Sequence, residues 1–153
     1  MDGDPVEVRA ARDASEVEAA KRLRLRVFTE EQGIPTEVEI DGLDPGATHI
    51  VAVRHGKVIG TCRLRFPRGR CKLERMAIDP GHRGAGVGRL LVGGAEREAA
   101  RQGAHQIVMH AQRQVEGFYA GCGYSVEGDP FLEEGIPHVL MRKPLVPADR
   151  IGT

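Results

Sequence analysis

Four glycines and an arginine, placed between an apolar segment and a helix, form the part of this sequence best suited to chemistry. The segment runs from Leu73 to Leu91 and reads LERMAIDPGHRGAGVGRLL, with Arg83 ahead of the last three glycines. Glycine lets a backbone turn tightly and bring its N–H groups close to a ligand. The first turn of a helix adds unpaired N–H donors and a partial positive charge, which favour phosphate. The segment therefore predicts a site for a phosphorylated cofactor.

Two common nucleotide motifs do not fit this loop. A P-loop requires a lysine and a hydroxyl residue after its last glycine, whereas Arg89 and Leu90 follow Gly88. The dinucleotide fingerprint requires G-x-G-x-x-G, whereas the last three glycines here alternate with single residues. The spacing that remains is Arg83-x-x-Gly86-x-Gly88. A glycine-rich turn that binds nothing is the alternative.

The elements that would position this loop follow from the period of the apolar residues. Strands are expected over residues 6–10, 48–53, 58–66, 72–78, 107–111, 124–126 and 138–141. Helices are expected over residues 13–30, 87–103 and 115–120. A polar, proline-containing loop is expected over 32–47. Gly93 and Gly94 each cost a helix about 1 kcal/mol relative to alanine, so a close neighbour is expected there.

Composition bounds the class of protein. The 153 residues predict a single domain over 1–153, and the balance of 22 basic and 22 acidic residues favours neither nucleic acid nor an anionic membrane as a partner. The acidic start MDGDPVEVRA is not typical of a signal peptide, which predicts a cytoplasmic protein. The three cysteines match no metal or disulfide spacing, so reduced thiols are expected, with Cys62 and Cys71 as packing residues.

The loop and a second segment together resemble a known family. Arg83-x-x-Gly86-x-Gly88, between a strand and an amphipathic helix, resembles the R/Q-x-x-G-x-G/A pyrophosphate loop of the GNAT acetyltransferases. Residues 111–124 resemble that family's N-x-x-A-x-x-F-Y-x-x-x-G-F segment, with Gln112 at the asparagine position and Val115 at the alanine position. The resemblance implies an α+β GNAT acyl-CoA N-acyltransferase fold, a mixed, mostly antiparallel sheet flanked by helices. Two neighbouring strands would splay apart to admit the pantetheine arm.

The resemblance also implies acetyl-CoA as the acetyl donor and the residues that would bind it. The backbone of the strand before the loop would pair with pantetheine at Met76, Ala77 and Ile78. The loop N–H groups would bind the pyrophosphate at Arg83, Gly84, Ala85, Gly86, Val87 and Gly88. The side chain of Arg83 or Arg89 would add a charge-assisted contact. Gln112 and Tyr119 complete the expected cofactor site.

Tyr119 is the expected general acid. In the family, the corresponding tyrosine lies near the sulfur of acetyl-CoA and can protonate the departing thiolate. A thiol with a pKa of about 8.5 is a moderate leaving group, so a positioned hydroxyl is chemically sensible. The alternative is that Phe118 and Tyr119 both pack in the core, and Phe118 is expected to do so.

A protonated acceptor amine requires a base. An amine with a pKa of about 10.4 is protonated at neutral pH, and removing its proton first costs roughly 4 to 5 kcal/mol. The candidates are a water chain, Glu74, His138, His110 and Glu31. Several relatives carry a catalytic glutamate at the level of Glu74, so Glu74 and His138 are the expected catalytic pair beside Tyr119. Their alternatives are an ion pair of Glu74 with Arg63 or Arg75 and a surface role for His110.

The N-terminal half sharpens the resemblance to one branch of the family, typified by ElaA. Residues 24–35, 39–49 and 133–138 carry this likeness. Glu39, Asp41 and Asp44 could form a hard-metal cluster, but carboxylates so close in a loop are more often solvated or capping groups, so no metal is expected. Together with Glu31 and Glu134 they could instead receive a cationic amine.

Two other functions remain open at this point. Acyl-homoserine-lactone synthases have a related fold and a comparable R-x-x-x-F plus E-x-D-x-x-D arrangement, although they usually lack such a clean glycine loop. A non-catalytic CoA-binding module is the other alternative. For the enzyme, the expected partner is a small-molecule or peptide amine of unknown identity, and family habit allows a homodimer.

Overall fold

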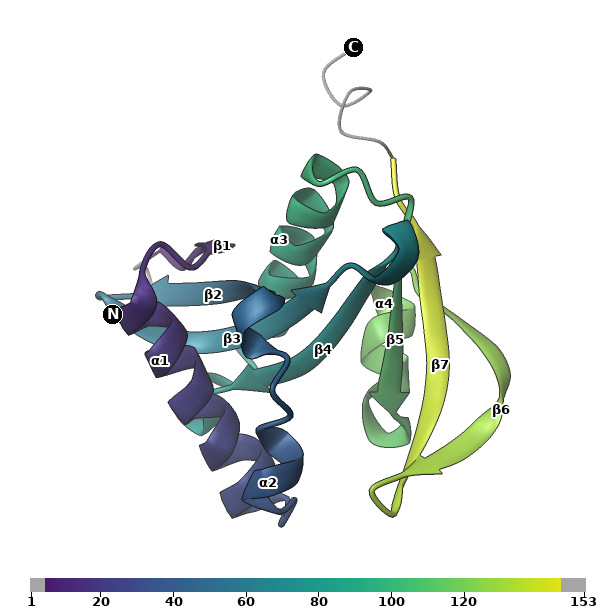
Figure 1. Ribbon diagram of the computed structural model, residues 1–153, viewed down its shortest axis with the longest axis horizontal. Coiled ribbons are helices and arrows are strands. Elements are labelled where there is room, and N and C mark those ends of the chain that lie inside the picture. The colour runs from purple at the N-terminus through teal and green to yellow at the C-terminus, as the bar shows by residue number, and fades with distance from the viewer. Residues whose placement is uncertain (1–4, 147–153) are drawn as a thin grey trace.

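A seven-stranded sheet organises the computed structural model, which describes residues 5–146 (Figure 1). The ends of the expected domain, residues 1–4 and 147–153, lie outside the described residues. The strands follow the order β1-β2-β3-β4-β5-β7-β6 across the sheet. Their bounds are β1 Glu7–Ala10, β2 Thr48–Arg54, β3 Lys57–Arg65, β4 Cys71–Ile78, β5 Gln106–Gln112, β6 Ser125–Glu133 and β7 Ile136–Pro144.

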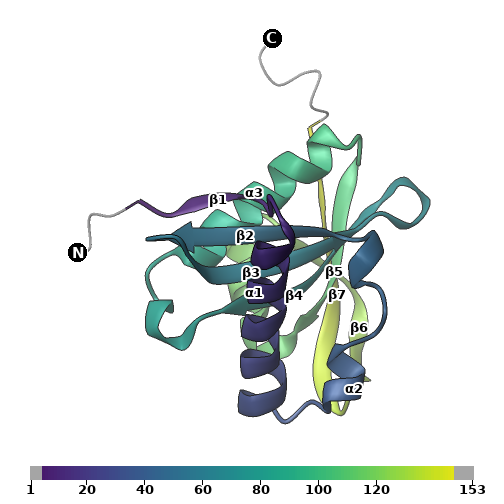
Figure 2. The same cartoon turned by 60° about the vertical axis from the view of Figure 1, so that its left-hand side comes forward.

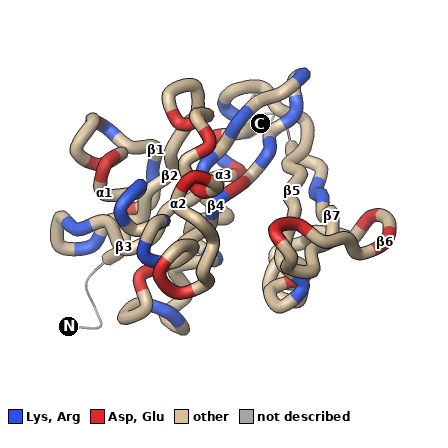
Figure 3. Tube along the Cα trace, turned by 60° about the horizontal axis from the view of Figure 1, so that its bottom comes forward, with Lys and Arg blue, Asp and Glu red and all other residues tan. Residues whose placement is uncertain are grey.

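One strand pair differs from all the others. β4 and β5 run parallel, whereas the remaining neighbours are antiparallel. They pair only where Cys71 meets Ile107 and Lys72 meets Val108. Beyond that point the strands separate, and Figure 3 shows the β5, β7 and β6 half set apart from the β1 to β4 half. The predicted α+β class, the mixed sheet and the splayed neighbouring strands are confirmed.

Helices cover both faces of the sheet. Their bounds are α1 Ala14–Arg24, α2 Thr36–Glu39, α3 Val87–Arg101 and α4 Glu116–Gly121. Asp13 caps α1, because its carboxylate accepts a hydrogen bond from the Glu16 N–H at 3.0 Å. α1 packs on one face through Ala20 and Leu23, and α3 packs on the other (Figure 2). No helix within residues 5–146 has the length and apolar character to cross a bilayer.

The first expected helix and the loop after it differ from the prediction. The α-helix ends at Arg24 and continues as a π-helix, η1 Leu25–Glu31. The predicted loop over 32–47 contains the four-residue α2 and a 3-10 turn, η2 Asp44–Gly46. A single wider turn hardly changes the spacing of apolar residues, and a one-turn helix is too short to show a period.

The last two strands are longer than predicted. Each spans nine residues, whereas the sequence showed apolar spacing only over 124–126 and 138–141. β6 is an edge strand, mostly exposed, and its pairing with β7 is irregular between Glu127 and Phe131. Polar residues with Gly128 and Pro130 hide the alternation that identifies a strand, and an edge position tolerates them.

The expected close neighbour is confirmed at Gly94 but not at Gly93, and the packing role of the two strand cysteines is confirmed. A Cβ on Gly94 would overlap the side chain of Val8, so β1 crosses α3 where the helix lacks a side chain. Gly93 has no comparable neighbour. Cys62 and Cys71 are free thiols in the core, and burial raises the pKa of both, for Cys71 to about 12. Buried protonated thiols fit packing residues.

Candidate active site

The splay between β4 and β5 opens into a cavity of about 860 Å³. Residues from both strands, the glycine loop, α4 and the β6–β7 hairpin line it. Beyond Lys72, the edge of β4 that faces β5 has no strand partner among residues 5–146. Its backbone groups are therefore available to a ligand that extends along the strand.

A β-bulge in β4 lies beside this cavity. Between the pairs Arg63–Glu74 and Thr61–Ala77, β4 has two residues where β3 has one. Arg75, in the bulge, has a φ of 57°, a left-handed conformation that costs a non-glycine residue about 1–3 kcal/mol. Its guanidinium forms an ion pair with Glu39 at 2.6 Å. The ion pair thus stabilises the Arg75 side chain at the bulge, where the edge of β4 changes direction.

The glycine loop lies at the N-terminus of α3. Gly84 and Gly86 have φ values of 81° and 83°, and a Cβ at either position would meet open space. Positive φ, rather than crowding, therefore explains the glycines. α3 is 15 residues long and begins at Val87, so its first N–H groups have no partner within the helix. Loop and helix end together form a cradle for an anion.

The arginines expected to contact phosphate have partners within the protein. Arg83 donates two hydrogen bonds to Glu31, at 2.9 and 2.7 Å, and a third to the Ile78 carbonyl at 3.1 Å. The hydrogen bond to Arg83 lowers the pKa of Glu31. Arg89 donates to the Gly121 carbonyl at 3.4 Å. To contact a phosphate, the Arg83 guanidinium would have to break its ion pair with the Glu31 carboxylate.

Gln112 forms a second contact across the cavity mouth. Its amide donates to the side-chain oxygen of Gln32 at 2.9 Å, and Gln114 donates to its oxygen at 2.6 Å. Gln32 directly follows Glu31, so neighbouring residues at the end of η1 contact both sides of the splay. Gln32 was not predicted as a site residue, because its partner is 80 residues away.

Tyr119 lies at the inner end of the cavity. It is 5% exposed and makes edge-to-face contacts with Phe118 and Tyr124, at 5.0 and 6.1 Å between ring centroids. Burial raises its pKa, so the hydroxyl keeps its proton at neutral pH. Within residues 5–146, that hydroxyl makes no hydrogen bond, which leaves it free for a ligand.

The expected core position of Phe118 is wrong. Phe118 is 36% exposed and lines the cavity. A Cβ on Gly88 would lie 3.1 Å from its ring, so this glycine makes room for the phenylalanine. The short α4 directs Phe118 toward the glycine loop rather than the sheet, which the sequence of one helical turn cannot show.

Glu74 lies in an ion-pair cluster. Its carboxylate contacts Arg63 at 2.8 Å, Arg65 at 2.7 Å and Lys72 at 3.4 Å. Burial alone would raise the pKa of Glu74, but the hydrogen bonds and charges of Arg65 and Arg63 lower it to about 2. Such a carboxylate is a weak base. The geometry fits the ion-pair alternative, with Arg65 rather than Arg75 as the second arginine.

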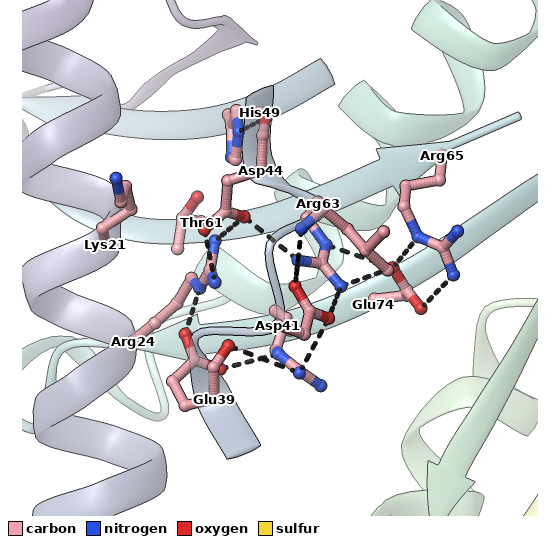
Figure 4. A network of polar contacts seen from close by, with 12 residues as sticks. Lys21, Arg24, Glu39, Asp41, Asp44, His49, Thr61, Arg63, Arg65 and Glu74 are labelled. Carbon is pink, nitrogen blue, oxygen red and sulfur yellow. Dashed lines mark hydrogen bonds and ion pairs between the residues drawn. The ribbon is translucent and has the colours of Figure 1, made fainter. Parts of the chain in front are cut away.

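The acidic loop joins the same network (Figure 4). Arg24 binds Glu39 at 2.6 Å and Asp44 at 2.8 Å, and Arg63 binds Asp41 at 2.8 Å. Both arginines are 1% exposed or less. Buried guanidinium groups require carboxylate partners, so Glu39 and Asp44 are ion-pair partners rather than solvated groups. Asp41 is exposed and also accepts a hydrogen bond from the Leu43 N–H at 3.0 Å, so the predicted solvated or capping role is confirmed there. Arg75 also pairs with Asp41, from which it is 34 residues away in sequence.

His138 and His110 share one carboxylate. His138 Nδ1 lies 2.7 Å from the Ile136 carbonyl, and its Nε2 lies 3.6 Å from Glu133 Oε2. His110 Nδ1 lies 2.8 Å from Glu133 Oε1. Phe131 stacks on His138 and meets the edge of His110. Glu133 was not predicted, although its spacing from Phe131 along β6 places both on the face of His138.

The structure brings most of the predicted site residues to this cavity. Those that line it are Glu74, Met76, Ile78, Arg83, Gly84, Gly86, Val87, Gly88, Gln112, Tyr119 and His138. Ala77 instead packs among the core residues beneath α1, and Ala85 is not part of the lining. Glu31 and Glu134 line the cavity as well. Among the described side chains, no group of three or more His, Cys, Asp or Glu is arranged to hold a metal ion.

The splayed parallel pair, the glycine loop at a helix N-terminus and the buried tyrosine define the GNAT class of acyltransferases. Residues 10–145 match the family model described as an acetyltransferase (GNAT) domain. The chain belongs to the GNAT acetyltransferase family. YjcF of Bacillus subtilis, described as an uncharacterized N-acetyltransferase, is 39% identical over 134 residues, which cover 87% of this chain and 96% of YjcF.

Solved structures share the fold. Escherichia coli ElaA superposes with a TM-score of 0.79 at 22% identity, covering 92% of this chain and 99% of ElaA. An aminoglycoside 6'-N-acetyltransferase, solved with coenzyme A, superposes with a TM-score of 0.76 at 16% identity over 92% and 98% of the two chains. The predicted resemblance to the family, with ElaA among its structural neighbours, is confirmed.

Proposed function

We propose that this chain is an N-acetyltransferase that moves the acetyl group of acetyl-CoA to a primary amine. The observation that carries the proposal is a single cavity that joins an unpaired strand edge, a glycine cradle and the hydroxyl of Tyr119. The amine would attack directly in a ternary complex, without an acetyl-enzyme intermediate. Acetyl-CoA would supply an acetyl group already activated as a thioester.

The proposed cofactor site uses backbone more than side chains. The free edge of β4 at Met76, Ala77 and Ile78 would pair with the amide groups of pantetheine. The N–H groups from Arg83 to Gly88 would hold the pyrophosphate at the start of α3. The aminoglycoside enzyme with coenzyme A supports this choice of ligand, because its fold is the same. Such anchoring would orient the reacting groups, which supplies much of the rate.

Tyr119 is the proposed general acid. Its raised pKa keeps a proton on the hydroxyl, and its position in the cavity lining makes that proton available. It would protonate the departing sulfur, whose thiolate is otherwise a moderate leaving group. Phe118 packs beside it and restricts the ring.

His138 is the proposed general base. A carbonyl oxygen accepts only, so the contact with Ile136 assigns the neutral ring proton to Nδ1 and leaves a lone pair on Nε2. Glu74 is the weaker candidate, because arginines occupy its oxygens and lower its pKa. The acceptor would be a small-molecule or peptide amine. A cytoplasmic location belongs to the proposal from the sequence, and a homodimer from the family resemblance.

The buried network disfavours the acyl-homoserine-lactone-synthase alternative. Arg24, Glu39, Asp41 and Asp44, which suggested it, bind one another or Arg63. Their presence is thus explained without a second substrate.

Calorimetric titration with acetyl-CoA, with NADH and ATP as controls, tests the cofactor. We expect saturable binding of acetyl-CoA alone. Release of the CoA thiol with a panel of primary amines then separates an enzyme from a CoA-binding module, which would bind without turnover. Absence of acetyl-CoA binding would overturn the proposed function.

A further inference from the structure

Two proton acceptors face each other across a gap in the cavity lining. His138 Nε2 and Glu133 Oε2 are 3.6 Å apart, which is too far for a hydrogen bond. His138 is 6% exposed, and within the described residues the contact of its Nε2 is the one with Glu133 at 3.6 Å, beyond hydrogen-bond distance. In a neutral ring with its proton on Nδ1, the Nε2 lone pair and the carboxylate repel one another unless a hydrogen-bond donor contacts both.

Glu133 is held in place for such a donor. His110 Nδ1 donates to its other oxygen at 2.8 Å, because an ionised carboxylate only accepts. The carbonyl of Ile136 fixes the ring of His138 from the opposite side. Glu133 and His138 therefore each have one polar atom held by a neighbouring group, and a second polar atom available to a ligand in the cavity that they line.

The charges nearby favour a cation in the gap. Glu134 adds a second negative charge at the hairpin turn. Arg113, on the neighbouring η5 turn Arg113–Val115, pairs with Glu116 at 3.4 Å, and Lys72 pairs with Glu74 on its own strand, β4. These basic groups thus have acidic partners of their own, and His110 contacts Glu133 through Nδ1.

We propose that Glu133 Oε2 and His138 Nε2 form the recognition point for the primary ammonium group of the acceptor. This inference rests on the proposed function and names how that site selects its second substrate. The carboxylate binds the cation, and an N–H bond of the ammonium breaks as an H–Nε2 bond forms. The electron pair stays on the amine nitrogen, which becomes the nucleophile, while Glu133 stabilises the resulting imidazolium.

Ring-nitrogen NMR tests the geometry without turnover. Long-range ¹H–¹⁵N spectra of the whole chain, with His138 assigned by its loss in His138→Gln, should show a proton on Nδ1 and a lone pair on Nε2. A proton on Nε2 would overturn the proposal.

The same spectra test the ligand with n-butylammonium chloride as the probe, in the presence of CoA. The expected result is a saturable shift of the His138 Nε2 resonance. Tetramethylammonium carries the same charge without N–H donors and should give no shift. Equal effects of the two cations, or no effect of either, would contradict the assignment.

Glu133→Gln is the decisive variant, and Glu127→Gln is its matched control. Glu127 lies on the same strand, pairs with Arg142 at 2.7 Å and is not part of the cavity lining. Glu133→Gln should abolish the butylammonium shift, whereas Glu127→Gln should preserve it. Retention of the shift in Glu133→Gln would overturn the proposal.

Kinetics provide a second readout with any amine that the wild type acetylates. Glu133→Gln should raise KM for the amine by about fivefold or more while KM for acetyl-CoA stays unchanged. An equal loss for both substrates would assign Glu133 a purely structural role. Failure of acetyl-CoA binding would instead overturn the proposed function. The NMR result on the ring nitrogens of His138 would be interpreted separately, because it does not depend on turnover.

Discussion

The guanidinium of Arg83 and the carboxylate of Glu31 form a two-pronged ion pair at 2.9 and 2.7 Å, although 52 residues separate them. The pair connects the glycine loop after β4 to the end of η1. A phosphate in the loop would compete with Glu31 for the same guanidinium. Cofactor binding and the conformation of the η1 end are therefore expected to be linked.

Replacing Glu31 should strengthen cofactor binding. In Glu31→Gln, Arg83 has no ion pair to break before it binds phosphate. The affinity for acetyl-CoA should therefore rise by about twofold to threefold, as expected for a partly exposed ion pair. Calorimetry measures the change, and the exposed neighbour in Glu30→Gln is the control. Unchanged affinity in Glu31→Gln would show that Arg83 keeps away from the phosphate.

Gly86 tests the anion cradle. Gly86→Asp places a carboxylate beside the phosphate and should reduce acetyl-CoA binding by more than about tenfold. Asparagine has the same shape without the charge and tolerates positive φ, so Gly86→Asn should lose much less affinity. Similar losses in both variants would attribute the effect to backbone strain, and full binding by Gly86→Asp would refute the placement of the loop.

Tyr119 tests general acid catalysis. Tyr119→Phe keeps the ring contacts and removes the proton, so kcat should fall by about 10² or more with little change in acetyl-CoA affinity. Tyr124→Phe is the control, because the Tyr124 hydroxyl bonds to Glu96 at 3.0 Å and should affect stability by about 1 kcal/mol rather than kcat. Steady-state kinetics with a cognate amine decide, and an unchanged kcat in Tyr119→Phe would remove the acid role.

Glu74 should govern stability in acid. Its pKa is lowered from 4.5 to about 2, so its contribution to stability is present above the unfolded-state pKa and is lost as pH falls through the folded-state value. Chemical denaturation between about pH 5 and pH 2 should therefore show a falling free energy of unfolding, by roughly 3 kcal/mol at most from this group.

Glu74→Gln completes this test. The variant should be less stable at neutral pH and show a flatter profile in acid, because Arg63 and Arg65 lose a carboxylate. A variant that keeps wild-type stability but loses turnover would instead support Glu74 as the base.

The sequence alone determined the parts of the protein that depend on local backbone constraints. Gly84 and Gly86 mark positive φ, and their spacing from Arg83 indicated the cradle at the start of α3. The apolar periods identified the strands around it, and the likeness to a family placed Tyr119 beside it. Each of these signals lies within one short stretch of chain, where neighbouring residues restrict one another directly.

Tertiary structure alone decided which charges and rings meet. Glu39, Asp41 and Asp44 are partners of buried arginines from other elements, and pairing across the sheet gave Glu133 its two histidines. A carboxylate has the same sequence signal whether it is solvated, paired or directed into a cavity. The difference lies in desolvation and in partners up to 52 residues away, which become defined only when the chain has folded.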